Sequence, residues 1–218
     1  MAIYYFLKNN LFQLKTTNPI KFRRKAIGAD WKPSNVGLDD VILGNTAWGA
    51  KTVKATKPAT QSKVRLISGR NSPVYSYDDT IDTKADPDLV GKSVLDIWNE
   101  RVSAIREKFQ NLRTVVLIKS NDLNEVVVFE FDTIRYDPEL FAWQWNKNGN
   151  LVGVEKSKAE HKFTWQPHGS QFTTIESVPE KSLIIRIKQP ETLDKEKILS
   201  ALGFDKSWIS ITQKDGNK

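Results

Sequence analysis

The stretch GLDDVILGNTAWGAKTVKA, residues 37–55, combines two aspartates, a short apolar run, a Gly-Asn turn and a second run that carries two lysines. Apolar and β-branched residues on both sides of a turn are typical of a hairpin. We therefore predict paired strands at residues 40–43 and 47–55, and we treat residues 37–56 as the region most relevant to function.

Loop length decides which residues meet across this hairpin, because paired numbers in an antiparallel ladder keep a constant sum. A four-residue loop places Asp40 opposite Lys51, and a three-residue loop places Asp39 there instead. The neighbouring positions are mostly apolar. In either register an aspartate and a lysine share a largely buried face, and a charged pair in that setting needs a reason.

Hydrolysis of a phosphodiester bond supplies such a reason. A carboxylate can hold Mg²⁺, which lowers the pKa of the attacking water, while an ammonium group orients that water and offsets the developing charge. The alternative is a cross-strand salt bridge, which contributes only about 0–1 kcal/mol when it is exposed. The pair alone does not decide between these two interpretations.

The segment DDVILGNTAWGAKTVK resembles the active-site hairpin of the PD-(D/E)xK nucleases, the superfamily of most type II restriction endonucleases. On this resemblance Asp40 takes the position of the metal-binding aspartate and Lys51 that of the lysine. Gly49 stands where the family has Asp or Glu. The resemblance implies a mixed central β-sheet flanked by helices, a restriction-endonuclease-like core, and Mg²⁺ as cofactor.

Several arrangements would compensate for Gly49. The second carboxylate could be Asp39, or it could come from the long helix, where Glu100 lies. The active lysine could be Lys54 in a shifted register. Otherwise the site is degenerate and only binds.

Beyond the hairpin, apolar side chains recur every three or four residues over 90–112, which predicts a long amphipathic helix. Residues 3–14 fit either a helix or a buried strand. Further strands are predicted at 63–67, 114–118, 125–131, 161–165, 171–175 and 183–188, and a final helix at 194–202. The sequence thus predicts an α/β or α+β fold with a mixed sheet.

Composition narrows the setting. The 218 residues, 39% hydrophobic and 27% charged, fit one domain over 1–218. Because no stretch has the apolar length of a membrane span and the first residues lack the features of a signal peptide, we expect a cytoplasmic protein. The lack of cysteine excludes disulfides and thiolate chemistry.

Charge is distributed unevenly along the chain. Residues 1–70 hold 13 Lys and Arg against three acids, and residues 71–218 hold 20 against 23. A positive field of this kind favours a polyanionic partner, with double-stranded DNA first, although composition does not distinguish DNA from RNA. We expect phosphate contacts from exposed basic residues, namely Arg23, Arg24, Lys25 and Lys57.

Two regions carry residues suited to reading bases, 68–77 and 143–175. They combine aromatic side chains with amides, hydroxyls and basic groups, of which Gln and Asn suit adenine and Lys and His suit guanine. The candidate DNA-binding residues are Arg70, Asn71, Gln166, His168, Ser170 and Gln171. The alternative is that the aromatic residues are core strand positions and that Gln166 to Gly169 form an ordinary turn.

Together these features predict a Mg²⁺-dependent type II restriction endonuclease that cleaves double-stranded DNA at a short sequence. A chain of this size that cuts both strands of a palindrome is expected to act as a homodimer. The alternative is a DNA- or RNA-binding protein that keeps a nuclease-like fold without catalysis, and Gly49 is the feature that favours it.

Overall fold

The computed structural model describes residues 29–31, 38–77, 86–188, 194–205 and 207 of the chain. Contacts between Cα atoms divide the chain into two compact units, residues 1–186 and 187–218, and each is described by itself. The element predicted at 3–14 and the predicted phosphate contacts Arg23, Arg24 and Lys25 lie outside the described residues.

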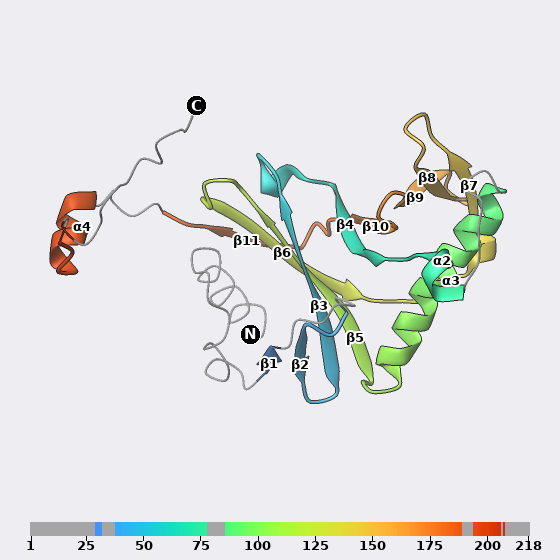
Figure 1. Cartoon of the computed structure of the whole chain (residues 1–218), viewed down its shortest axis with the longest axis horizontal. Coiled ribbons are helices and arrows are strands. Elements are labelled where there is room, and N and C mark those ends of the chain that lie inside the picture. The colour runs from blue at the N-terminus through green and yellow to red at the C-terminus, as the bar shows by residue number, and fades with distance from the viewer. Residues whose placement is uncertain (1–28, 32–37, 78–85, 189–193, 206, 208–218) are drawn as a thin grey trace, which may run out of the picture. The chain divides into compact units, whose positions relative to one another are not determined.

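The first unit contains a mixed six-stranded sheet (Figure 1). Its two long central strands, β3 and β5, run parallel, and the other neighbours are antiparallel. In spatial order the strands are β1 (Asp30–Trp31), β2 (Val41–Leu43), β3 (Thr46–Lys54), β5 (Asn111–Lys119), β6 (Glu125–Asp132) and β11 (Leu183–Arg186). The predicted strands 63–67, 114–118, 125–131, 161–165, 171–175 and 183–188 all coincide with observed strands.

A second, antiparallel sheet has five strands, and the sequence analysis did not predict it as a separate sheet. Its spatial order is β4 (Lys63–Arg70), β10 (Gln171–Ser177), β9 (Glu160–Gln166), β8 (Leu151–Glu155) and β7 (Phe141–Trp145). Most of residues 143–175, interpreted from sequence as a base-reading region, therefore lie in strands β7 to β10. Their aromatic residues Trp143, Phe163, Trp165 and Phe172 are buried in the core.

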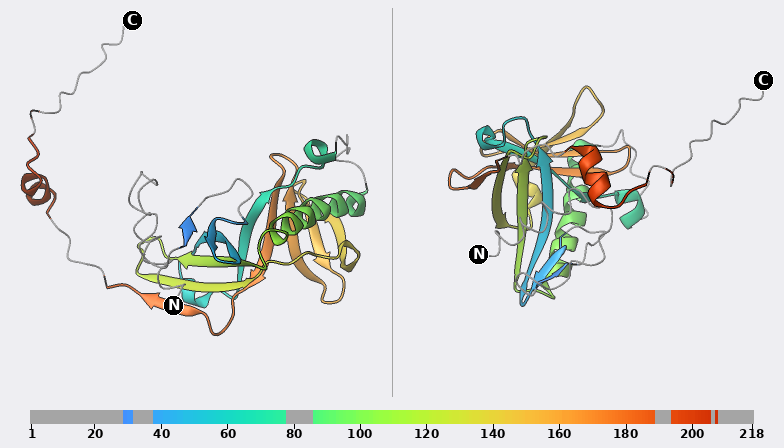
Figure 2. Two further views of the ribbon diagram at one scale, coloured as in Figure 1. Left: turned by 90° about the horizontal axis from the view of Figure 1, so that it is seen from below. Right: turned by 90° about the vertical axis from the view of Figure 1, so that its left-hand side faces the viewer.

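The long helix α3 (Pro87–Arg106) lies along the five-stranded sheet (Figure 2). The side chain of Asp86 caps its first turn by accepting a hydrogen bond from the Asp88 amide at 2.9 Å, and Pro87 occupies the first position. The apolar stripe of α3, including Val94 and Trp98, packs on the sheet aromatics in one core cluster. Burial of this stripe, more than helix propensity, stabilises α3.

The helix was predicted too long at its C-terminal end. It ends at Arg106, and Leu112 belongs to β5 instead of the helix. Leu112 pairs with Ala47 of β3, and both are buried in the same core as the helix stripe. Leu112 is apolar because the strand buries it against that core. Its distance in sequence from the apolar residues of α3 matches the helical repeat, so the prediction extended the helix to include it.

Shorter elements complete the described chain. In the first unit these are the 3₁₀ turns η1 (Pro58–Thr60) and η2 (Pro138–Leu140) and the helix α2 (Pro73–Tyr77), which lies where only a loop was expected. The second unit contains α4 (Lys195–Ala201), close to the predicted helix 194–202. No helix within the described residues is long and apolar enough to cross a membrane.

Candidate functional site

The β2–β3 hairpin closes with a two-residue turn, Gly44-Asn45, because Leu43 pairs with Thr46. Gly44 has φ of 55°, which suits the first central position of a tight type II′ turn. Both predicted registers were therefore wrong: continuing the observed register places Leu38, not an aspartate, level with Lys51. The two-residue turn forms instead of a three- or four-residue loop because glycine adopts positive φ without strain.

Asp40 nevertheless lies on the same face of the hairpin as Lys51. The register places Asp40 level with Gly49, two positions before Lys51, so the two charged residues are diagonal neighbours. The Asp40 carboxylate is buried, and Oδ2 accepts a hydrogen bond from the Ala50 amide at 2.9 Å. Asp40 directly precedes β2, so this bond gives the Ala50 amide an acceptor beyond the β2–β3 ladder and fixes the position of the carboxylate.

Lys51 extends from the inner face of β3 into the space between the two sheets. Burial lowers the pKa of its ammonium group, and the charge of Asp40 opposes that shift. No hydrogen bond joins the Lys51 side chain to another residue in the described part of the chain. A desolvated ammonium without a protein acceptor is costly, and such groups are usually paired or neutral.

A narrow cavity surrounds Lys51, with room for about one water molecule, about 10 Å³. We call it the Lys51 cavity. Its walls come from both sheets, from α3 and from the segment after β6; they are Leu38, Leu66, Ser68, Trp98, Thr114, Phe131, Thr133, Ile134, Tyr136, Thr174 and Glu176. Lys51 thus lies where the two sheets and the helix converge.

Glu176 and Tyr136 of the Lys51 cavity, and Lys162 bonded to Glu176, were not singled out from the sequence. Glu176 accepts hydrogen bonds from Lys162 at 2.8 Å and from the Tyr136 hydroxyl at 3.4 Å. Burial, with the nearby charge of Glu176, raises the pKa of the Tyr136 hydroxyl. Lys162 lies in β9, Glu176 in β10 and Tyr136 in the segment after β6. No local sequence signal could therefore have linked these residues to the hairpin.

Asp39, the alternate aspartate, is half-buried, and its Oδ1 atom is buried without a hydrogen-bond partner among the described residues. Such an orphaned carboxylate oxygen is suited to a cation. Mg²⁺ is commonly bound through one or two carboxylates together with water and substrate phosphates. The continued register places Asp39 level with Ala50, on the face opposite to Asp40 and Lys51. No group of three or more acidic or histidine ligands occurs within the described ranges.

Lys54, the alternate lysine, lies on the opposite, outer face of β3 and is exposed. It is level with Lys119 of β5. Burial, and then the charge of Lys54, lower the pKa of Lys119. Lys57, predicted to contact phosphate, is exposed just before η1. The strand alternation therefore separates Lys54 from the Lys51 cavity.

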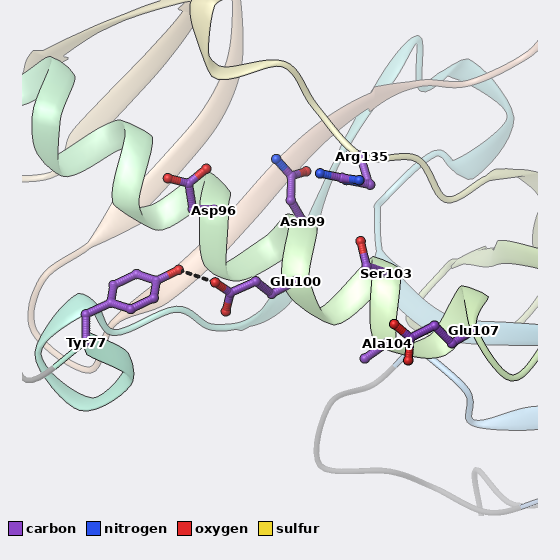
Figure 3. Close-up of a pocket in the computed structure, with 8 residues that line it drawn as sticks. All are labelled: Tyr77, Asp96, Asn99, Glu100, Ser103, Ala104, Glu107 and Arg135. Carbon is purple, nitrogen blue, oxygen red and sulfur yellow. Dashed lines mark hydrogen bonds between the residues drawn. The ribbon is translucent and has the colours of Figure 1, made fainter.

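Glu100, the helix carboxylate considered as a second metal ligand, lines a separate pocket of about 630 Å³ (Figure 3). It is exposed on α3 and accepts a hydrogen bond from the Tyr77 hydroxyl at 2.8 Å. Burial, followed by this bond and the charges of Glu100 and Asp96, raises the pKa of Tyr77 to about 12. This pocket shares no residue with the lining of the Lys51 cavity.

The structure brings the predicted base-reading residues together at one end of the five-stranded sheet. Gln171 pairs with Arg70 on one side and with Gln166 on the other. His168 and Ser170 lie in the turn between β9 and β10, where His168 is exposed and Ser170 has φ of 53°. Two sequence segments about 95 residues apart thus form one surface.

Asn71 occupies a different place from its neighbours. Its side chain is fully buried, donates to the Val94 carbonyl at 2.9 Å and accepts from Arg101 at 2.7 Å. Its main-chain carbonyl accepts from the Trp165 indole at 2.7 Å. Asn71 therefore ties the end of β4 to α3 and β9, and its amide is enclosed in the protein interior.

Comparison with known proteins adds no relative. No protein-family model, curated protein sequence or solved structure matches this chain. The site therefore has to be interpreted from its own residues and geometry.

Proposed function

We propose that this protein is a Mg²⁺-dependent endonuclease of the type II restriction class, with a restriction-endonuclease-like core, that cleaves double-stranded DNA at a short sequence. The observation that carries the proposal is the position of Lys51: a half-buried, desolvated ammonium, without an acceptor in the described chain, on the same face as the Asp40 carboxylate. An attacking water in the Lys51 cavity would supply the missing acceptor.

In this proposal Asp40 holds the metal, and Asp39 is the alternate ligand. Bound there, Mg²⁺ would polarise the scissile phosphate and lower the pKa of the attacking water. Lys51 orients that water and offsets the negative charge that develops on the phosphate. The hydrogen bond from the Ala50 amide to Asp40 keeps the carboxylate in position relative to the lysine.

A second candidate function is binding of DNA or RNA without cleavage. Gly49 favours it, because no carboxylate occupies the position two residues before Lys51. For the nuclease, cleavage of a palindromic site further predicts a homodimer, since a two-fold symmetric site is most simply matched by two-fold protein symmetry.

The test is incubation of the purified full-length protein with a long duplex DNA, with Mg²⁺ or with EDTA, followed by gel electrophoresis. Asp40→Asn removes the charged ligand, and Asp122→Asn is the matched control in an exposed turn. We expect discrete Mg²⁺-dependent fragments from the wild type and from Asp122→Asn, and intact DNA from Asp40→Asn.

Two other outcomes would contradict the proposal. DNA that stays intact but is retarded on a native gel would support the binding protein instead. DNA that is neither cut nor retarded by the wild type would exclude both functions.

A further inference from the structure

Three segments leave the five-stranded sheet at the same end. The turn between β7 and β8 spans 146–150, and the turn between β9 and β10 spans 167–170. Leu151 at the start of β8 pairs with Trp165 near the end of β9, so both turns project from the same end of the sheet. Arg70, the last residue of β4, is level with Gln171 at that end. We call these residues, Arg70 with 146–150 and 167–170, the turn end.

Both turns are held rigidly. The Asn146 side chain accepts hydrogen bonds from the amides of Asn148 at 2.9 Å and Asn150 at 3.0 Å. In the other turn, the Ser170 amide donates to Pro167 at 3.1 Å, and the Ser170 carbonyl accepts from the Asn71 amide at 2.8 Å. Side chains displayed on such turns lose little conformational freedom when they bind.

The turn end carries the positive charges of Arg70 and Lys147. Arg70, Lys147 and His168 are exposed, and segments 69–72, 144–151 and 166–171 contain no Asp or Glu. Within the described residues, neither Arg70 nor Lys147 forms an ion pair. The surface is thus complementary to a polyanion.

The opposite end of the same sheet provides a contrast. There Lys63 pairs with Glu160 at 3.1 Å, and Lys158 pairs with Glu155 at 3.0 Å. The basic residues at that end are neutralised by carboxylates, so the two ends of one sheet differ in the charge that they offer to a partner.

The side chains of the turn end are of the kinds that distinguish bases. Arg and Lys bind the O6 and N7 atoms of guanine, and Asn and Gln form paired hydrogen bonds with adenine. Arg70, Lys147 and Asn148 of the turn end, and Gln166 directly before its second turn, supply both kinds. A two-stranded ribbon also fits the major groove of B-DNA, which is about 12 Å wide.

Strand β4 connects the turn end to the Lys51 cavity. Leu66 and Ser68 of β4 line that cavity, and Arg70 lies two residues further along the same strand, about 7 Å away. The turn end and the lining of the Lys51 cavity are therefore parts of one strand.

We infer that the turn end is the surface that reads the base sequence of duplex DNA, with the 146–150 turn, above all Lys147 and Asn148, contributing beside Arg70 and His168. This inference rests on the proposed function. It separates recognition, on the five-stranded sheet, from cleavage, on the β2–β3 hairpin.

The test measures binding of the full-length protein to a fluorescein-labelled 40-bp duplex by anisotropy in EDTA, where no cleavage occurs. The duplex carries the site identified from the cleavage fragments, or a random-sequence pool if there are none. Lys147→Ala is compared with Lys158→Ala, which removes one exposed turn lysine from the other end of the same sheet. Thermal unfolding verifies that each variant is folded.

We expect Lys147→Ala, and more strongly Lys147→Ala with Asn148→Ala, to weaken binding about tenfold or more. Lys158→Ala should change it less than twofold. Equal effects of Lys147→Ala and Lys158→Ala, or no effect of either, would overturn the inference that the turn end reads bases, while DNA binding by the protein would stand. A wild-type protein that binds no duplex would overturn the proposed function as well.

Discussion

Asp40 and Lys51 are diagonal neighbours on the inner face of the β2–β3 hairpin, where the continued register places Gly49 level with Asp40. A carboxylate held by the Ala50 amide therefore lies near a desolvated ammonium. This arrangement provides a cation ligand and a cation at one place, which the hydrolysis of a phosphodiester requires.

The cost of burying Lys51 can be measured by replacing it. Because burial outweighs the attraction of Asp40 and lowers the lysine pKa, the charged form is disfavoured in the folded protein. We expect Lys51→Met to stabilise the protein at pH 7, by less than the about 1–4 kcal/mol seen when a whole buried ion pair is replaced by apolar residues, because the buried Asp40 remains. Urea unfolding measures the change, with the outer-face variant Lys54→Met as control. A destabilised Lys51→Met would mean that the Asp40 attraction dominates.

The same shift predicts how stability depends on pH. Between the lowered pKa of Lys51 and the unfolded value of 10.5, the unfolded chain binds the proton that the folded chain has lost, so this group makes the folded state more stable as pH rises. Urea unfolding of the wild type and of Lys51→Met at pH 7 and at pH 10 should show a smaller difference in stability at the higher pH. A constant difference would contradict a lowered pKa.

Cleavage should depend on pH in the opposite direction. If the protonated lysine offsets the charge on phosphate, activity falls as pH rises through its lowered pKa, with a midpoint below 10.5. Single-turnover cleavage rates from pH 7 to pH 10 measure this decline. A rate that keeps rising over the whole range would show that Lys51 is not needed in its charged form.

We expect the buried hydrogen bonds of Asn71 to stabilise the folded protein. Asn71→Ala removes a buried amide that bonds the Val94 carbonyl and Arg101. Because Arg101 then loses a partner within a partly buried network, we expect a loss of about 2–3 kcal/mol in the free energy of unfolding. The control Asn148→Ala, in an exposed turn, should change it by less than about 0.5 kcal/mol. Equal effects in urea unfolding would contradict the interior position of Asn71.

Gly91 of α3 allows the helix to approach the sheet. A Cβ atom there would lie 2.2 Å from the Trp143 ring, closer than real contacts permit. Gly91→Ala, which normally stabilises a helix by about 0.5–1 kcal/mol, should here destabilise the protein by about 1–3 kcal/mol. The exposed neighbour Lys92→Ala is the control. Thermal unfolding of Gly91→Ala with Trp143→Leu should show partial recovery, and its absence would contradict steric overlap with Trp143.

The amino-acid sequence by itself determined much of the secondary structure. Strand alternation and apolar runs located the hairpin and the strands β4, β5, β6, β9, β10 and β11, but not β1, β7 or β8. The stripe from Val94 to Ile105 located α3. These signals are local, since a strand or helix must turn its apolar side chains to one face. The sequence also placed an aspartate and Lys51 on one hairpin face, although in registers that the structure does not have.

Only the tertiary structure decided how these elements meet. The two-residue turn set a register in which Asp40 is diagonal to Lys51, and a one-residue change would have exchanged the faces of the strand. The buried place of Asn71, the Glu176 and Tyr136 walls of the Lys51 cavity, and the meeting of Arg70 with Gln166 all join segments distant in sequence. Such contacts are selected by the packing of two sheets and a helix around a shared core, and no local pattern contains that information.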